Sequence, residues 1–251
     1  MYMLYTFKKP ANWSTLPLYS KLIYYKTIVG EDYAPYVDKL EAKRIVKEIC
    51  DDDIKVAKVK RILSGPDDFT QNDIDPNFMI KAAHGSGWNI SMTAETKVED
   101  VKVRLKEWNR TYIGSGENQY KYIKPQFFIE EKMDDAILGR TDSAVTYMFR
   151  CIYGVPVTIG VRSRMAQNSY DMNWNLLELR TKKSSDFFEK PAQLDEMIRL
   201  AKKLSKEFEF VRIDFYLGKD GIYFSEFTFT PNGGYRLYSH KMEQELGALW
   251  I

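Results

Sequence analysis

The stretch from residue 210 to residue 235 constrains the fold most, because strand-forming residues, a tight turn and regularly spaced charges coincide in it. Two runs rich in β-branched and aromatic residues, 211–217 and 222–230, flank the tetrapeptide Gly218-Lys219-Asp220-Gly221. Asp-Gly between alternating apolar residues is a strong signal for a β-hairpin. The stretch is therefore predicted to form a hairpin and to carry the active site.

The charges of this hairpin are predicted to gather on one face. Side chains alternate between the two faces of a strand, so Arg212, Asp214 and Tyr216 point the same way. A three-residue loop would place Asp214 opposite Glu226, whereas loops of two or four residues would shift the pairing by one position. Facing carboxylates repel each other and call for a cation, for which magnesium is suited. The pattern predicts either a magnesium site beside Arg212, which could hold a phosphate or an oxyanion, or an ordinary exposed charged cluster.

Length and composition indicate a globular protein with small-molecule partners. The 251 residues allow one large domain or two small ones, and the net charge of +2 is too balanced to predict a nucleic-acid surface. No run approaches the ~18 apolar residues of a membrane span, and the N-terminal segment lacks the apolar core of a signal peptide. Cys50 and Cys151 show neither a disulfide nor a metal-binding spacing. We therefore expect a cytoplasmic protein without a nucleic-acid partner or a membrane span.

Several common enzyme classes are excluded by the motif content. The chain has only two histidines, His84 and His240, which argues against a histidine-rich zinc site. It contains neither a GxSxG nucleophile elbow nor a Walker P-loop.

Two lysine-bearing segments are candidates for binding phosphate. Asp38 is typical of the N-cap of a helix that runs to about Cys50, and in this helix Lys39 and Lys43 share a face. Lysines in this arrangement either bind an anion or are simply solvated. Residues 77–83 are predicted to form a buried strand that leads into a glycine-rich loop.

That loop reads His84-Gly85-Ser86-Gly87 and follows Lys81 closely. Glycines let backbone N–H groups close around phosphates, and a nearby lysine supplies the countercharge. The alternative is a simple hairpin turn beside a lysine that extends to solvent.

Other segments are predicted to be scaffold. Apolar residues at spacings of three and four predict helices at 98–108 and 194–208, and residues 144–162 are predicted to form two strands joined at Tyr153-Gly154. Residues 163–180 have a loop-like composition. An apolar strand ends at 130–133, where backbone groups could contact an adenine or the acids could be solvated.

Six segments, taken in order, resemble the TupA-like branch of the ATP-grasp superfamily, which is associated with teichuronopeptide and other polysaccharide biosynthesis. They lie within about residues 36–247 and read VDKLEAKRIV, PNFMIKAAHGSGWNI, FFIEEKM, YDMNWNLLEL, VRIDFY and YFSEFTFTPNGGY. The resemblance implies an α+β ATP-grasp fold in which two α+β subdomains sandwich the nucleotide. It implies a reduced N-terminal region over 1–37 and a catalytic domain over 38–251. That domain would contain a nucleotide flap subdomain at about 76–132 and a metal-binding subdomain at about 133–251.

The resemblance also implies a reaction. ATP with Mg2+ would activate a carboxylate as an acyl phosphate, and an amine would then attack to form an amide. The partners would be a carboxylate acceptor, either a small molecule or a glycan, and an amine donor. Two alternatives use the same nucleotide site: a kinase of a hydroxyl substrate, and a nucleotide- or glycan-binding module without turnover.

Site residues follow from the resemblance by position. The residues that correspond by position to the ATP-binding residues of the family are Lys39, Lys81, Gly85, Ser86, Gly87, Glu130, Glu131 and Met133. Asp214 and Glu226 resemble the magnesium ligands. Arg212 resembles the catalytic arginine that steadies the acyl phosphate and the tetrahedral intermediate.

The chain departs from the general superfamily pattern at two positions. Many ATP-grasp enzymes have Glu-x-Asn at the second metal position, where this chain has Glu226-Phe227-Thr228, as the TupA-like branch tends to have. Thr228 and Asn232 are therefore candidates for metal or substrate binding. Met148 stands near a position where the branch often has a lysine. Three acids remain open as the ribose-binding residue: Asp134, Asp135 and Asp142.

Overall fold

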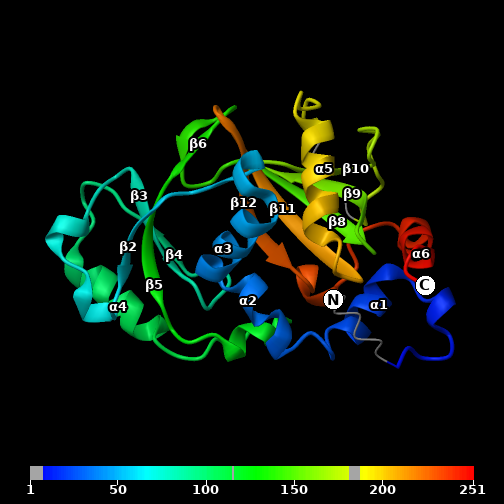
Figure 1. Cartoon of the computed structure of the whole chain (residues 1–251), viewed down its shortest axis with the longest axis horizontal. Helices are drawn as coiled ribbons and strands as arrows, with labels where there is room; N and C mark the ends of the chain where they lie inside the picture. The colour runs from blue at the N-terminus through cyan, green and yellow to red at the C-terminus, as the bar shows by residue number, and fades with distance from the viewer. Residues whose placement is uncertain (1–7, 115, 181–186) are drawn as a thin grey trace.

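The computed structural model describes residues 8–114, 116–180 and 187–251, so residues 1–7 of the expected N-terminal region lie outside its description. Two β-sheets lie side by side with helices packed against them (Figure 1). The helices are α1 (Leu18–Tyr25), α2 (Ala34–Val37), α3 (Lys39–Cys50), α4 (Val98–Trp108), α5 (Leu194–Ser205) and α6 (His240–Ala248).

The larger sheet is built around the predicted hairpin. Its main strands are β1 (Lys55–Val56), β12 (Gly221–Thr228), β11 (Phe210–Gly218), β8 (Thr146–Ile152), β9 (Val155–Arg162) and β10 (Gln167–Tyr170), in that spatial order. Two short strands, β6 (Met133–Asp135) and β7 (Gly139–Thr141), extend it beyond the end of β11. β1 pairs with β12 in parallel and the other pairs are antiparallel.

The smaller sheet forms the other part of the molecule (Figure 1). Its strands are β2 (Val59–Leu63), β5 (Phe127–Glu131), β3 (Phe78–Ala82) and β4 (Asn89–Ser91), in that spatial order. Helix α4 covers it with Val101 and Leu105, which join a separate hydrophobic core that includes Ile80. The two predicted strands 144–152 and 155–162, and the predicted helix 98–108, are confirmed.

The hairpin is confirmed, but its loop is shorter than the three residues that we assumed. Gly218 pairs with Gly221, which leaves a two-residue turn. A β-bulge on β12 then shifts the register, so that Asp214 still faces Glu226. A bulge places one extra residue on one strand and restores the pairing that the shorter turn alone would have moved.

Two further sequence-based expectations need correction. The loop-like stretch 163–180 contains strand β10, which pairs with β9, because an edge strand needs only one partner and tolerates polar residues on its open side. The composition of residues 54–62 predicts one strand, but the structure divides this run into β1 and β2, which belong to different sheets. The chain therefore crosses between the two sheets at 57–58.

Helix α5 covers the apolar face of the larger sheet. Leu194, Met197, Ala201 and Leu204 of α5 are buried, and the helix packs on β8, β9 and β11. Phe208, which we placed in this helix, is buried just beyond its end.

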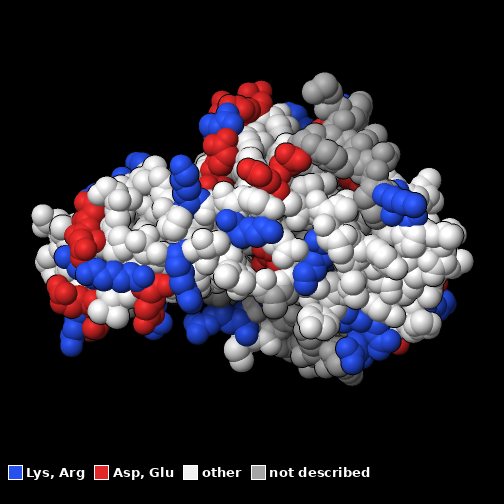
Figure 2. Space-filling view, turned by 90° about the horizontal axis from the view of Figure 1, so that it is seen from below, with Lys and Arg blue, Asp and Glu red and all other residues white. Residues whose placement is uncertain are grey.

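None of the helices in the described ranges is long and apolar enough to cross a membrane. On the face shown in Figure 2, basic and acidic side chains are interspersed over both parts of the molecule.

Candidate nucleotide and metal site

Three adjoining cavities lie along the boundary between the two sheets. The largest, of about 440 Å³, opens over the charged face of β11 and β12. A second, of about 120 Å³, shares Gly87, Tyr216, Ser225 and Glu226 with it. A third, of about 30 Å³, shares Lys81, Glu130 and Tyr216 with the second. Shared walls make the three cavities one continuous candidate site.

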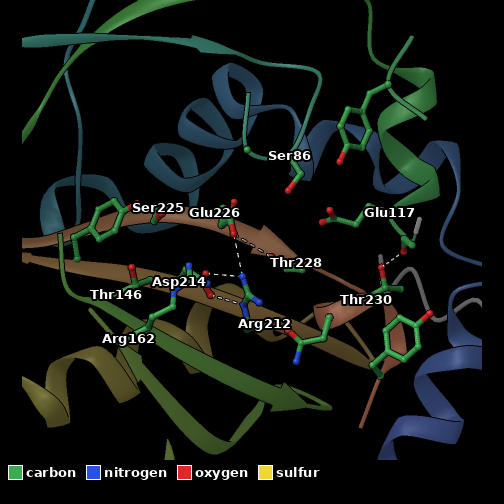
Figure 3. A pocket seen from close by; sticks show the side chains of 17 residues that line it. Ser86, Glu117, Thr146, Arg162, Arg212, Asp214, Ser225, Glu226, Thr228 and Thr230 are labelled. Carbon is green, nitrogen blue, oxygen red and sulfur yellow. Dashed lines mark hydrogen bonds and ion pairs between the residues drawn. The ribbon is translucent and has the colours of Figure 1, made fainter. Parts of the chain in front are cut away.

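Arg212 lies in the middle of the residues that line the largest cavity (Figure 3). Its Nε donates to Asp214 Oδ1 at 2.7 Å, and its Nη2 donates to Asp214 Oδ2 at 2.7 Å and to Glu226 Oε1 at 2.9 Å. Burial tends to lower the pKa of Arg212, but the two carboxylates outweigh it and raise the pKa. Burial raises the pKa of Asp214 to about 6, against the opposing effect of Arg212. The three side chains form one coupled charge cluster.

The two carboxylates fit a magnesium ion that also binds phosphate. Mg2+ in nucleotide sites usually takes one or two protein carboxylates, with waters and phosphates completing an octahedron. Asp214 and Glu226 lie opposite each other on neighbouring strands and both line the cavity. In the described ranges no cluster of three or more His, Cys, Asp or Glu side chains could enclose a metal by itself. The donor set is therefore suited to a metal shared with a ligand, not to a closed structural site.

A buried ion network lines the second and third cavities. Lys43 Nζ lies 2.6 Å from Glu130 Oε2, and Lys81 forms an ion pair with the other carboxylate oxygen of Glu130. Burial tends to raise the pKa of Glu130, but the two lysines outweigh it and hold the pKa below its ordinary value. Glu130 consequently stays charged between two cations. The expectation that Lys43 could be simply solvated is wrong, because its ammonium group is in this network.

The glycine turn and Lys39 meet at the same place. Lys39 Nζ donates to the carbonyl oxygen of Gly85, while Ser86 and Gly87 line the largest cavity. Gly87 has φ of +72°, which favours glycine, and a side chain on Gly85 would collide with the rings of Trp88 and Tyr112. Burial lowers the pKa of Lys39. The turn therefore requires its glycines for conformation and space.

The residues expected at the adenine lie around the smallest cavity. Glu130, Glu131 and Met133 all line it, together with Asp142. Of the other two ribose candidates, Asp135 accepts backbone N–H groups of Ile137, Leu138 and Val145, and Asp134 pairs with Lys219. Asp142 is thus the candidate acid that faces the cavity.

The positions that depart from the superfamily pattern also lie on the charged face. Thr228 and Asn232 line the largest cavity, and Thr228 Oγ1 is 3.4 Å from Glu226 Oε1. Met148 is buried opposite Asp214 in the sheet, so it does not supply a cation there. Asn232 has φ of +55° in the turn after β12.

Thr146 and Glu117 line the largest cavity without having been identified from the sequence, whereas for Arg162 the sequence left two interpretations open, a ligand cleft or the surface. Thr146 and Arg162 pair with each other across β8 and β9, and Thr146 also pairs with Tyr216 of β11. All three line the largest cavity. Alternation along β11 placed Tyr216 on the charged face, whereas the positions of Thr146 and Arg162 depend on strand pairing between distant segments. Glu117, which also lines this cavity, lies in a segment that carries no recognisable motif.

Comparison with known proteins identifies the family. The model of the family described as "TupA-like ATPgrasp" matches residues 20–251. A search of curated proteins found no match.

One solved structure supports the fold, and two others show weaker similarity. D-Alanine-D-alanine ligase from Helicobacter pylori superposes with a TM-score of 0.50 at 15% identity, covering 96% of this chain and 70% of that one. D-alanine--D-alanine ligase from Bacillus anthracis, complexed with ATP, gives a TM-score of 0.46 at 12% identity over 78% of this chain. An ADP complex of N5-carboxyaminoimidazole ribonucleotide synthetase gives 0.46 at 12% identity over 80% of it. The chain spans only 54% and 46% of the latter two structures.

Proposed function

Because the chain belongs to the TupA-like ATP-grasp family, we propose that it is an ATP-dependent ligase that joins a carboxylate to an amine. A carboxylate oxygen takes the γ-phosphoryl group of ATP, so that an acyl phosphate forms and ADP is released. The amine nitrogen then forms a bond to the acyl carbon and loses a proton, and phosphate leaves as the amide forms. The proposed acceptor is a carboxylate of a small molecule or of a (poly)saccharide, such as a uronic acid.

The observation that carries this proposal is the way Arg212 is held. Among the described residues, its hydrogen bonds to Asp214 and Glu226 use only Nε and Nη2. The two N–H groups of Nη1 therefore remain for a ligand in the cavity. A guanidinium fixed in this way can donate to an acyl phosphate and to the oxyanion that develops during attack, without reorganising.

The remaining roles follow from position. Lys39 and Lys81, near the glycine turn, would bind the phosphates, and Asp214 and Glu226 would hold magnesium. When bound, magnesium would neutralise phosphate charge and orient the transferred group. The protein supplies no nucleophile in this scheme, so its contribution is positioning and electrostatic stabilisation.

A second candidate is a nucleotide- or glycan-binding module without turnover. It is favoured by Thr228, which replaces the usual second metal-binding amide with a weaker hydroxyl ligand, and by the apolar Met148 beside Asp214. A kinase that phosphorylates a hydroxyl would use the same nucleotide residues and stop before amide formation.

The first experiment is calorimetric titration with ATP in the presence and absence of Mg2+. Asp214→Ala removes a proposed metal ligand, and Lys81→Ala removes a proposed phosphate contact. We expect each variant to lose about tenfold or more in magnesium-dependent affinity, the effect of losing a charged contact. Lys97→Ala, at an exposed position beside α4, should bind as the wild type does. Thermal unfolding of each variant checks that the fold is retained.

The products then distinguish the candidates. Wild-type protein is incubated with ATP, magnesium, uronic acids and amino acids, and the products are identified by mass spectrometry. Release of ADP and phosphate together with an amide supports the ligase, whereas a stable phosphorylated product indicates the kinase. Wild-type protein that binds no ATP would rule out both enzymes.

A further inference from the structure

The largest of the three adjoining cavities extends beyond the proposed nucleotide and metal site. At one end it shares Ser225 and Tyr216 with the second cavity, where Lys39 and Lys81 lie. The other end, beyond Arg212, is lined by Gly116, Glu117, Thr230, Asn232, Gly233 and Tyr235. Figure 3 shows Glu117 and Thr230 on the side of Arg212 away from Ser225. This end of the cavity leaves space next to Arg212 for the reacting substrates.

The position of Glu117 at this end of the cavity is fixed by contacts that its neighbours Gly116 and Asn118 make. The carbonyl oxygen of Gly116 accepts a hydrogen bond from Thr230 Oγ1, and Asn118 Nδ2 donates to the carbonyl oxygen of Lys26 at 3.2 Å. Gly116 also approaches Gly233 so closely that a Cβ on it would lie 2.7 Å from the Gly233 Cα. The backbone around Glu117 is therefore fixed to the turn that follows β12.

The carboxylate of Glu117 points into the cavity toward Arg212 and Glu226 (Figure 3). Burial and the charge of Glu226 raise the pKa of this carboxyl group, whereas Arg212, Lys39 and the Ser86 side chain act to lower it. The Arg212 guanidinium is paired with Asp214 and Glu226, and across the described ranges no lysine or arginine forms an ion pair with Glu117. A half-buried carboxylate that faces a second carboxylate across a cavity favours a bound cation there.

We propose that Glu117 binds the ammonium group of the incoming amine, so that the amine donor is a primary amine that is cationic at neutral pH. This inference rests on the ligase function proposed above. An ammonium group has three donors and no acceptor, which suits a carboxylate assisted by phenol and hydroxyl oxygens. Tyr112, Tyr235 and Thr230 supply such oxygens around the same end of the cavity. Glu117 thereby selects for cationic donors and places the amine beside the acyl group that Arg212 holds. Its carboxylate accepts the proton that the ammonium group loses before the nitrogen attacks.

The test is calorimetric titration of protein saturated with Mg2+ and a non-hydrolysable ATP analogue. The probes are glycine, L-glutamate and ethanolamine, with N-acetylglycine as a ligand that lacks the ammonium group. We expect at least one amine to bind the wild type, N-acetylglycine not to bind, and Glu117→Gln to weaken amine binding by about tenfold or more. Binding of the nucleotide analogue should change less than twofold.

Two further variants complete the design. Glu117→Asp keeps the charge and should retain part of the amine affinity, whereas Glu99→Gln, an exposed acid on α4, should behave as the wild type. If E117Q instead weakens Mg2+ binding tenfold, Glu117 is a metal ligand and the inference is wrong. If the wild type binds nucleotide but none of the amines, this inference alone falls. If the wild type binds no nucleotide, the ligase proposal falls, and this inference with it.

Discussion

His84 shows how a single residue fixes the base of the glycine turn. The ring is fully buried, its Nδ1 accepts from the backbone N–H of Gln126 at 3.1 Å, and its Nε2 lies 2.9 Å from the carbonyl oxygen of Trp108. The first contact needs an unprotonated Nδ1, so Nε2 carries the proton and donates to Trp108. Burial lowers the pKa of His84 below its ordinary value of 6.5. The residue is therefore neutral and structural.

This gives a pH-dependent prediction. Because the pKa of His84 is lower in the folded state than in the unfolded chain, the unfolded chain binds the proton first as pH falls. The contribution of His84 to the free energy of unfolding is complete above about pH 6.5 and is lost as pH falls through the folded pKa. NMR titration should give His84 a pKa below 6.5. A His84 pKa at or above 6.5 would contradict this assignment.

Glu130 is a second case in which one residue organises its surroundings. It lies between Lys43 and Lys81, which come from a helix and from a neighbouring strand. Removing one member of a buried charge network leaves the others unpaired. A loss of nucleotide affinity in Lys81→Ala must therefore be interpreted together with the thermal unfolding of that variant.

At the scale of elements, local signals predicted a helix cap and the two faces of a strand, and the structure shows both. Asp38 caps α3 by accepting N–H groups of Leu40 and Glu41 at 2.9 and 3.2 Å, and this cap begins the helix at Lys39. The alternation of β11 buries Val211, Ile213 and Phe215 and turns its charged residues to the cavity.

The N-cap can be tested on stability. Asp38→Ala removes the acceptor for both N–H groups and should lower the free energy of unfolding by about 1 kcal/mol. Asp38→Asn keeps an oxygen acceptor at the same position and should cost clearly less. Urea unfolding measures both, with an unchanged dependence on urea concentration showing that the unfolded states are comparable. Equal losses in the two variants would show that the cap hydrogen bonds are not the source of the effect.

At the scale of the whole molecule, the two ends of the described chain pack together beneath the larger sheet. Lys21 of α1 donates to the carbonyl oxygens of Gly247 and Trp250. The Trp250 ring is fully buried, stacks on Phe210 at 5.2 Å between centroids and donates from Nε1 to Glu209 at 2.9 Å. This packing couples the N-terminal and C-terminal helices to the start of β11.

Trp250 is accordingly expected to be a large contributor to stability. Trp250→Ala removes a fully buried aromatic ring and should cost about 3–5 kcal/mol. Leu249→Ala, next to it but 51% exposed, should change stability by no more than about 0.5 kcal/mol. Chemical unfolding of both variants tests the difference. A cost for W250A near that of L249A would mean that the ends of the chain do not stabilise the sheet.

The sequence by itself determined the features that depend on neighbouring residues. Alternation in 211–217 predicted the charged and apolar faces, the Asp-Gly turn predicted the hairpin, and Asp38 predicted the start of a helix. These signals are readable because the strand period, turn conformation and helix capping are set within a few residues. The ordered segments also indicated the family, which the family model confirmed.

Only the tertiary structure decided which distant residues meet. The bulge on β12 offset the shorter turn and kept Asp214 opposite Glu226. Pairing of β8 with β9 brought Arg162 to the cavity, and the contacts of Gly116 turned Glu117 toward it. Strand register and loop packing depend on contacts between segments far apart in the chain, so no local pattern contains them. The hairpin and the helix start were thus readable from the sequence, whereas the end of the cavity around Glu117 was not.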